Sequence, residues 1–234
     1  MTHPTREGES LPLDWKLTTT LRKTVASRLL VRASPFQNRW EQMLKGNARC
    51  PRLASRLELY SYLNRTYLDG GAAAIDLFEF GVYRGDSLRT WCMLNTNPHS
   101  RFYGFDSFEG LPEYWKPGRP KGAFSTFGET PEIKDPRVQI VVGLFQQSLP
   151  AFLSSYRPAR RIVVNNDSDL YSSTLYSLTR LNSVMPAGTL IIFDEFDDIL
   201  NEFRALCDYG DAYMREYKSV GATPWFTQTA VELL

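Results

Sequence analysis

Histidine is nearly absent from this chain of 234 residues, in which only His3 and His99 occur. His3 lies in a polar N-terminal stretch, and His99 lies in a turn that precedes a predicted strand. In a parallel sheet, that is the end of the strand away from bound ligands. The scarcity of histidine leaves a Ser-His-Asp or Cys-His catalytic unit almost without a candidate base, and it makes a histidine-ligated zinc site hard to build.

Cysteine is scarce as well, and Cys50, Cys92 and Cys207 are scattered without the spacing of metal ligands. An odd number of isolated cysteines is typical of free thiols in a reducing compartment. The sequence also has no apolar run near the roughly 20 residues of a membrane span. Residues 1–16 lack the apolar core of a signal peptide. We therefore expect a cytoplasmic protein without membrane association.

A strong excess of charge of one sign is missing too, since 27 Lys/Arg and 26 Asp/Glu give a formal net charge of +1. A nucleic-acid-binding protein usually carries a large basic excess, so nucleic acid is not an expected partner. Hydrophobic residues make up 43%, which argues against global disorder. The charge is nevertheless uneven, because residues 161–234 hold 11 acidic and 5 basic residues. This acidic third is compatible with a cation site or with solvated helix faces.

Short β-branched and aromatic runs alternate with helix-compatible segments along most of the chain. The runs that predict strands are 74–80, 101–105, 138–142, 161–164 and 189–193, with closing strands at 218–222 and 226–233. The predicted helices between them are 86–94, 172–184 and 199–213. This alternation predicts an α/β fold with a doubly wound, mostly parallel Rossmann-like sheet. Predicted helices at 21–32 and 52–68 make residues 1–70 an N-terminal helical extension and residues 71–234 the α/β domain.

The connection 110–137 is unusually long and contains five prolines and four glycines. A stretch of this length inside a compact domain is usually a lid or a binding loop. We expect it to close over a ligand, and the alternative is a disordered surface insertion.

Two strand ends carry the signals of a nucleoside site. The first is followed by the glycine pattern G-x-x-x-G within EFGVYRGDS (79–87), which differs from the G-x-G-x-x-G that holds a pyrophosphate. Tyr83 and Arg84 would crowd a phosphate, so the loop favours a nucleoside ligand without phosphates. The second strand ends at Asp106, where a carboxylate can accept both hydroxyl hydrogens of a ribose.

A third signal is acidic. Asp167 follows one apolar strand, and Asp194 and Glu195 follow the next, so in a parallel sheet all three can meet at one edge. Clustered carboxylates repel each other unless a cation lies between them. Oxygen ligands favour a hard ion, and Mg²⁺ is the expected one. The alternative is that Asp167 and Asp169 cap the following helix and that Asp194 begins a turn.

These motifs resemble the macrocin O-methyltransferase family, in the order EFGVYRGDSLRTW, YGFDSFEGLP, GLFQQSLP, DSDLYSST and IIFDEF. The resemblance extends from about Leu57 to Phe203. It implies the seven-stranded fold of class I S-adenosylmethionine (AdoMet) methyltransferases, with AdoMet as methyl donor and bound Mg²⁺. It further implies methylation of a sugar hydroxyl on an antibiotic or other natural product. It also implies homo-oligomers whose N-terminal segments help to cover the active site.

The resemblance assigns roles to individual positions. Those that match the donor site are Glu79, Gly81, Tyr83, Ser87, Asp106, Ser107 and Phe108. Those that match the metal carboxylates are Asp167, Asp194 and Glu195, and the catalytic positions are Asp194, as the base, and Asp167. The chain departs from the family at Glu195, where a second aspartate is common, and at Asn165, where histidine is common. Asn165 cannot exchange protons, so the proton must follow a different route or activity is low.

The chemistry that these parts allow is direct methyl transfer. A metal ion at vicinal hydroxyls lowers their pKa and orients one oxygen toward the methyl group, and a carboxylate takes the proton. Two other classes of protein remain open. Asp167-Ser168-Asp169 is a D-x-D pattern, which would suit a metal-dependent nucleotide-sugar glycosyltransferase, although it leaves Asp106 unexplained. The second is a non-catalytic protein with a methyltransferase-like fold, which stays possible because Asn165 replaces the common histidine.

Overall fold

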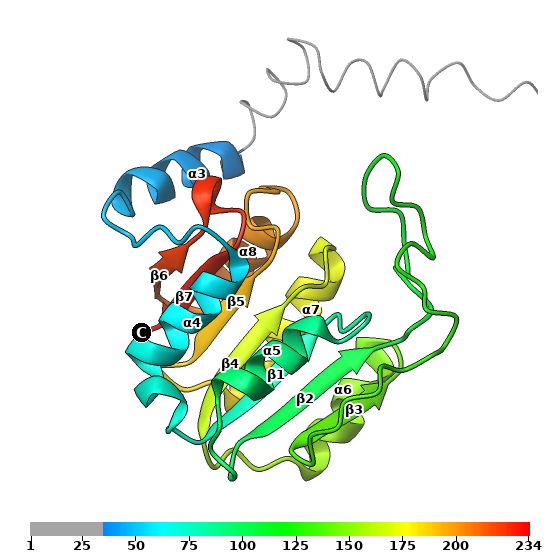
Figure 1. Ribbon diagram of the computed structural model, residues 1–234. Helices are drawn as coiled ribbons and strands as arrows, with labels where there is room; N and C mark the ends of the chain where they lie inside the picture. The colour runs from blue at the N-terminus through cyan, green and yellow to red at the C-terminus, as the bar shows by residue number, and fades with distance from the viewer. Residues whose placement is uncertain (1–34) are drawn as a thin grey trace, which may run out of the picture.

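One mixed sheet organises the molecule. The computed structural model describes residues 35–234, so the helix expected at 21–32 lies outside the described residues. The seven strands lie in the order β3-β2-β1-β4-β5-β7-β6, and β7 runs antiparallel to its neighbours β5 and β6 (Figure 1). Their bounds are β1 Ile75–Phe80, β2 Arg101–Asp106, β3 Val138–Val142, β4 Arg161–Asn166, β5 Leu190–Phe193, β6 Tyr217–Ala222 and β7 Thr229–Leu233. The predicted doubly wound, mostly parallel sheet is thus confirmed, with seven strands as the family resemblance implies.

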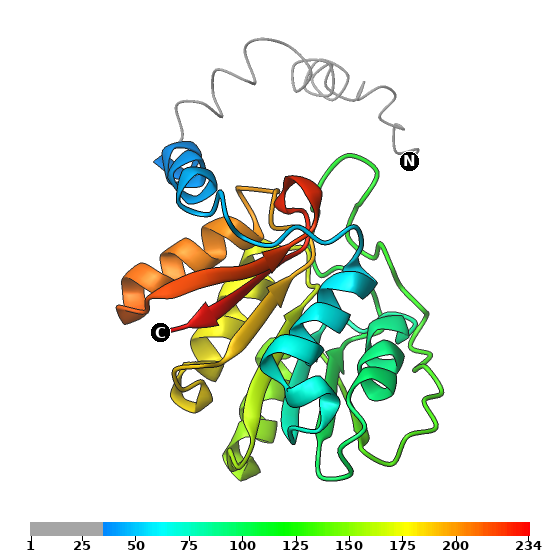
Figure 2. The same cartoon turned by 60° about the vertical axis from the view of Figure 1, so that its left-hand side comes forward.

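Helices cover both faces of this sheet. Their bounds are α3 Pro35–Gly46, α4 Arg56–Tyr67, α5 Asp86–Leu94, α6 Phe145–Ser155, α7 Tyr171–Leu181 and α8 Glu202–Tyr213. Short 3₁₀ turns lie at Asp69–Gly71, Asn182–Val184 and Pro224–Phe226. Helices α4 and α5 lie side by side on one face, and α6, α7 and α8 lie on the other (Figures 1 and 2). No helix within residues 35–234 is long and apolar enough to cross a membrane.

The two faces give two apolar cores, because successive strand side chains point to opposite sides. Strand β1 is buried along its whole length. Its Leu77 belongs to the core under α4 and α5, together with Leu59 and Leu63 of α4. Its Phe78 and Phe80 belong to the core under α6, α7 and α8. Helix α4 therefore belongs to the packed body of the protein.

Most predicted elements are confirmed to within a few residues, and two helices were not predicted. One is α3, whose Trp40 packs edge-on against Phe203 of α8 at 5.0 Å between ring centres. The other is α6, which contains Pro150 in its interior. Proline lacks the N–H that a helix interior needs, so it argues against a helix. The hydroxyl of Tyr176 donates to the carbonyl oxygen of Gln146 at 3.5 Å, which partly compensates.

The topology brings the carboxyl ends of β1, β2, β4 and β5 to one edge of the sheet. The chain leaves β1 through Gly81, which has a φ of 90°. A Cβ at this position would lie 1.9 Å from the carbonyl oxygen of Asp167. Only glycine allows so close an approach, so the loop after β1 and the loop after β4 are in direct backbone contact.

Candidate active site

A cavity of about 410 Å³ opens over these strand ends. The loop after β1 and the end of β2 form one part of its wall, and the loops after β4 and β5 form another. The first turn of α4 and the connection 110–137 complete it. Clefts at the carboxyl edge of a parallel sheet are the usual ligand sites of doubly wound folds.

Asp106 organises the β1 side of the cavity. Its Oδ2 accepts hydrogen bonds from the backbone N–H groups of Val82 and Tyr83, each at 2.8 Å. Its Oδ1 accepts one from the N–H of Phe108, also at 2.8 Å. Tyr83 and Phe108 both have positive φ, 50° and 61°, a conformation that side chains other than glycine adopt rarely. The carboxylate thus holds a strained loop in shape, and it still faces the cavity with lone pairs to spare.

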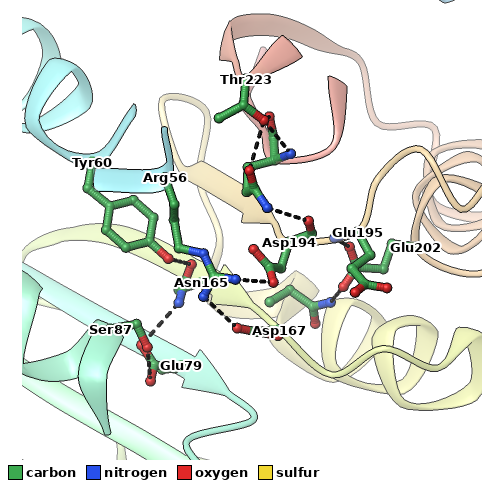
Figure 3. A network of polar contacts seen from close by, with 12 residues as sticks. Arg56, Tyr60, Glu79, Ser87, Asn165, Asp167, Asp194, Glu195, Glu202 and Thr223 are labelled. Atoms are coloured by element: carbon green, nitrogen blue, oxygen red, sulfur yellow. Dashed lines mark hydrogen bonds and ion pairs between the residues drawn. The ribbon is translucent and has the colours of Figure 1, made fainter. Parts of the chain in front are cut away.

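Behind this loop lies a buried hydrogen-bonded chain (Figure 3). The Tyr60 hydroxyl donates to Asn165 Oδ1 at 3.0 Å, and Asn165 Nδ2 donates to Glu79 Oε2 at 3.0 Å. Ser87 Oγ donates to Glu79 Oε1 at 2.7 Å. Glu79 is completely buried, and this burial raises the pKa of its carboxyl to about 8, against the opposing effect of the two donors. Asn165 is therefore engaged on both sides of its amide.

On the other side of the cavity, Arg56 lies between two carboxylates (Figure 3). Its Nη1 donates to Asp167 Oδ2 at 3.2 Å, and its Nη2 forms a short contact with Asp194 Oδ2. Burial and the neighbouring Asp194 raise the pKa of the Asp167 carboxyl well above its usual range, which Arg56 opposes. Asp194 Oδ1 is buried and has no hydrogen-bond partner among residues 35–234.

Glu195 turns toward another cation. Its Oε2 lies 2.9 Å from Nζ of Lys116, which belongs to the connection 110–137. The backbone N–H of Glu195 donates to Glu202 Oε2 at 2.8 Å, so the buried Glu202 of α8 fixes the turn after β5. Asp169 lies near Glu195, and its backbone has a positive φ of 62°. Burial, reinforced by the charge of Glu195, raises the pKa of the Asp169 carboxyl to about 7.

The cavity brings together most of the residues that the sequence singled out. Those that line it are Gly81, Tyr83, Ser87, Asp106, Ser107, Asp167, Asp194 and Glu195. Glu79 and Phe108 are buried behind the wall and support it from there. The sequence did not identify Arg56, Lys116 or Glu202. Arg56 follows the N-cap Ser55 of α4, and nothing in the pattern separates it from an ordinary exposed helix residue.

The expected magnesium site was an arrangement of three carboxylates, and the structure does not provide it in that form. No group of three or more His, Cys, Asp or Glu side chains suited to a metal ion occurs within residues 35–234. Asp167 and Asp194 lie together but share a guanidinium, and Glu195 is paired with Lys116. The carboxylates as they lie here do not fit Mg²⁺, because positive side chains already occupy the positions around them.

The sheet order, the antiparallel β7 and the cavity over the strand ends define a class I AdoMet-dependent methyltransferase fold. Residues 119–216 match the sequence model of the family described as Macrocin-O-methyltransferase (TylF). This segment contains Asp167, Asp194 and Glu195. The resemblance expected from the motifs is therefore confirmed over these residues, and the fold is that of class I AdoMet-dependent methyltransferases.

Solved structures show the same fold. CalS11, described as a calicheamicin methyltransferase, is 21% identical with a TM-score of 0.60, over 99% of this chain and 98% of that one. An apo structure of CalS11, described as a TDP-rhamnose 3'-O-methyltransferase, is 22% identical with a TM-score of 0.53, over 96% of each chain.

The O-methyltransferase NovP is 20% identical with a TM-score of 0.58, over 76% of this chain and 78% of that one. A structure described as cmcI-D160 Mg-SAM is 13% identical with a TM-score of 0.51, over 77% and 72%. No curated protein sequence matches the chain significantly.

Proposed function

We propose that this protein transfers the methyl group of AdoMet to a hydroxyl of a sugar carried by a natural product. The observation that supports it most is one cavity with two chemically different ends. Asp106 and the loop that it shapes suit a nucleoside without phosphates, and the pair Asp167 and Asp194 suits a hydroxyl that must lose a proton. The descriptions of CalS11 as a calicheamicin and TDP-rhamnose methyltransferase support a sugar acceptor.

In this proposal the methyl donor lies against the loop after β1, with its ribose hydroxyls at Asp106. The sulfonium of AdoMet is already an activated donor, so the protein has to orient the acceptor and remove one proton. Asp194 is the proposed base, because it lines the cavity and its Oδ1 has no hydrogen-bond partner in the described part of the chain. Arg56 holds the other oxygen of Asp194 and thereby fixes the orientation of the carboxyl group.

Magnesium activation, which the motifs imply and the description of cmcI mentions, is an alternative that an EDTA arm tests. The alternative of a nucleotide-sugar glycosyltransferase is tested by thermal unfolding with ligands. Protection by nucleotide sugars but not by S-adenosylhomocysteine would favour it. Assembly into a homo-oligomer and a cytoplasmic location are further parts of the proposal.

The test is calorimetry of S-adenosylhomocysteine with the wild type, Asp106→Ala, and Glu41→Ala as an exposed carboxylate outside the cavity. Hydrogen bonds to a charged acceptor contribute about 1.5–3 kcal/mol each. Asp106→Ala should therefore bind about tenfold more weakly or worse, while Glu41→Ala should match the wild type. Equal affinity of Asp106→Ala and wild type would remove the donor-site assignment. Methyl transfer is then measured by mass spectrometry over a panel of glycosylated natural products, with Mg²⁺ and with EDTA.

A further inference from the structure

Arg56 reaches the acidic pair from a distant part of the chain. It lies in the first turn of α4, which precedes the whole sheet in sequence, 111 residues before Asp167 and 138 before Asp194. Nevertheless its two terminal nitrogens contact one oxygen of each aspartate (Figure 3). The side chain of Asp194 is 13% exposed and that of Asp167 is 25% exposed, so neither charge is fully solvated.

Two ionised carboxylates that lie together repel each other, and the guanidinium between them relieves that repulsion. Its planar array of donors can serve two acceptors at once, and it stays protonated at any pH at which proteins are folded. The two aspartates take two of its five N–H donors, and the side chain is 40% exposed within the cavity wall. The guanidinium thus lines the space where an acceptor would bind in the proposed function.

Within the described residues, few oxygen ligands around Asp167 and Asp194 remain free for a divalent ion. Mg²⁺ requires near-octahedral oxygen coordination at about 2.0–2.1 Å. Glu195, the third expected ligand, is held by Lys116, and Asn165 has its amide oxygen on Tyr60 and its amide nitrogen on Glu79. An ion at the aspartates would also lie next to a fixed positive charge. It could bind there only if Arg56 moved away.

We propose that Arg56 is the resident cation of the acceptor site, in the position that the family motifs would give to a divalent metal. Arg56 keeps Asp167 and Asp194 together, orients the proposed base and makes turnover independent of divalent metal. It is a positioning residue, since it acts through the two aspartates. The inference rests on the proposed function for its catalytic consequence, and its structural part concerns metal binding alone.

The experiment exchanges one cation for another. Wild type, Arg56→Ala, Arg56→Gln and Arg56→Lys are titrated with Mn²⁺ by electron paramagnetic resonance, and melting temperatures are measured in Mg²⁺ and in EDTA. Arg65→Ala is the matched control, because it removes an exposed arginine from the other end of the same helix. Arg56→Gln keeps most of the side-chain length if the alanine variant folds poorly.

Wild type, Arg56→Lys and Arg65→Ala should bind Mn²⁺ weakly and melt at the same temperature in Mg²⁺ and EDTA. Arg56→Ala and Arg56→Gln should bind one Mn²⁺ about tenfold more tightly or better, because the carboxylates lose their counter-charge. Both should melt lower in EDTA and recover in Mg²⁺. With a suitable acceptor, wild-type turnover should persist in EDTA, while that of Arg56→Ala should need Mg²⁺.

Tight Mn²⁺ binding by the wild type, or no gain of Mn²⁺ binding in either Arg56→Ala or Arg56→Gln, would overturn the inference. Binding of S-adenosylhomocysteine is measured in every variant and should be unchanged, because Arg56 does not contact the proposed donor loop. Absence of that binding in the wild type would refute the proposed function, and it would leave the cation exchange at Arg56 to be judged from Mn²⁺ alone.

Discussion

Glu79, which the family resemblance assigns to the donor site, is a buried carboxyl engaged by protein groups. It is completely buried at the end of β1, with Ser87 and Asn165 as hydrogen-bond donors. No ion pair to Glu79 occurs within residues 35–234, and burial raises the pKa of its carboxyl to about 8, so the protonated form predominates near neutral pH. The neutral carboxyl links β1 to helix α5 through Ser87 and, through Asn165 and Tyr60, to α4. Its role is to hold the wall of the cavity in place.

This protonation makes stability depend on pH in a defined direction. The folded protein keeps the proton up to a pKa of about 8, whereas the ordinary value is 4.5. The folded state thus binds more protons between these limits, so the free energy of unfolding falls as pH rises from about 5 to 8. The slope is at most about 1.4 kcal/mol per pH unit for one group.

We predict that Glu79→Gln, which imitates the protonated carboxyl, flattens this part of the profile. Denaturant unfolding of wild type and variant at pH 6, 7, 8 and 9 measures the difference. Glu216→Gln, at an exposed carboxylate, should follow the wild type. Parallel profiles for the wild type and Glu79→Gln would show that Glu79 is ionised in the folded protein.

At the residue scale, the sequence predicts the strand-end positions well. Asp106 and Asp167 were identified because a carboxylate directly after an apolar strand falls at the ligand edge of a parallel sheet. Arg56 could not be identified in this way. Its role depends on how α4 packs on the sheet. Helical periodicity predicts which face of α4 is buried. It does not predict where the first turn lies relative to strands more than 100 residues away.

At the scale of elements, the connection 110–137 is more ordered than its proline and glycine content predicts. The backbone N–H of Leu111 donates to Ala123 O, and that of Gly122 donates to Leu111 O, which joins the two sides of the loop. Leu111 and Trp115 pack on Leu170 at the start of α7. The ion pair between Lys116 and Glu195 connects the loop to the turn after β5. These contacts, with hydrogen bonds such as that of Ser172 Oγ to Glu113, hold the loop beside the cavity, and its closure over ligands stays a prediction.

We predict that amide hydrogen exchange in 110–137 slows when S-adenosylhomocysteine and a glycoside acceptor are both present. The reason is that ligands beneath the loop add contacts that opening would break, beyond the apolar cluster, the Lys116–Glu195 ion pair and the hydrogen bonds that already hold it. Exchange is followed by mass spectrometry, with the turn 97–100 at the opposite end of the sheet as the internal control. An unchanged rate in 110–137 with both ligands bound would mark the segment as an insertion without a role in binding.

The missed helix α6 and the loop illustrate the same limit of sequence reasoning. Local patterns identify α5 because its amphipathic run is uninterrupted, and its predicted bounds, 86–94, are those observed. They fail for α6 because Pro150 is unfavourable within a helix, and tertiary contacts to α7 outweigh that preference.

For the molecule as a whole, the predicted division between residues 1–70 and 71–234 runs through one packed body. Helix α4 falls in the first part but is buried against the second. Leu59, Leu63 and Leu68 are completely buried in the core that includes Leu77 and Trp91. The first turn of the same helix carries Arg56 into the cavity. The α/β body therefore includes α4.

We predict that a chain starting at residue 71 does not unfold cooperatively. It loses at least three buried leucines, and removing even one buried leucine side chain typically costs about 2–5 kcal/mol, against a total stability of about 5–15 kcal/mol. A chain starting at Pro35 keeps every core side chain named above and should unfold in one transition. Thermal unfolding followed by circular dichroism distinguishes them, and a sharp transition for the shorter chain would make α4 dispensable.

The backbone contact at Gly81 links the two ends of the cavity mechanically. The N–H of Asp167 donates to the carbonyl oxygen of Phe80 at 2.9 Å, and Gly81 lies against the Asp167 carbonyl. In the proposed function, the loop that would hold the donor thus touches the residue at the acceptor end of the cavity, with no side chain between them. If the proposed methyl transfer is in line, this backbone contact helps to set the distance between donor and acceptor. Side-chain changes around the rim can alter which acceptor binds while leaving this contact intact.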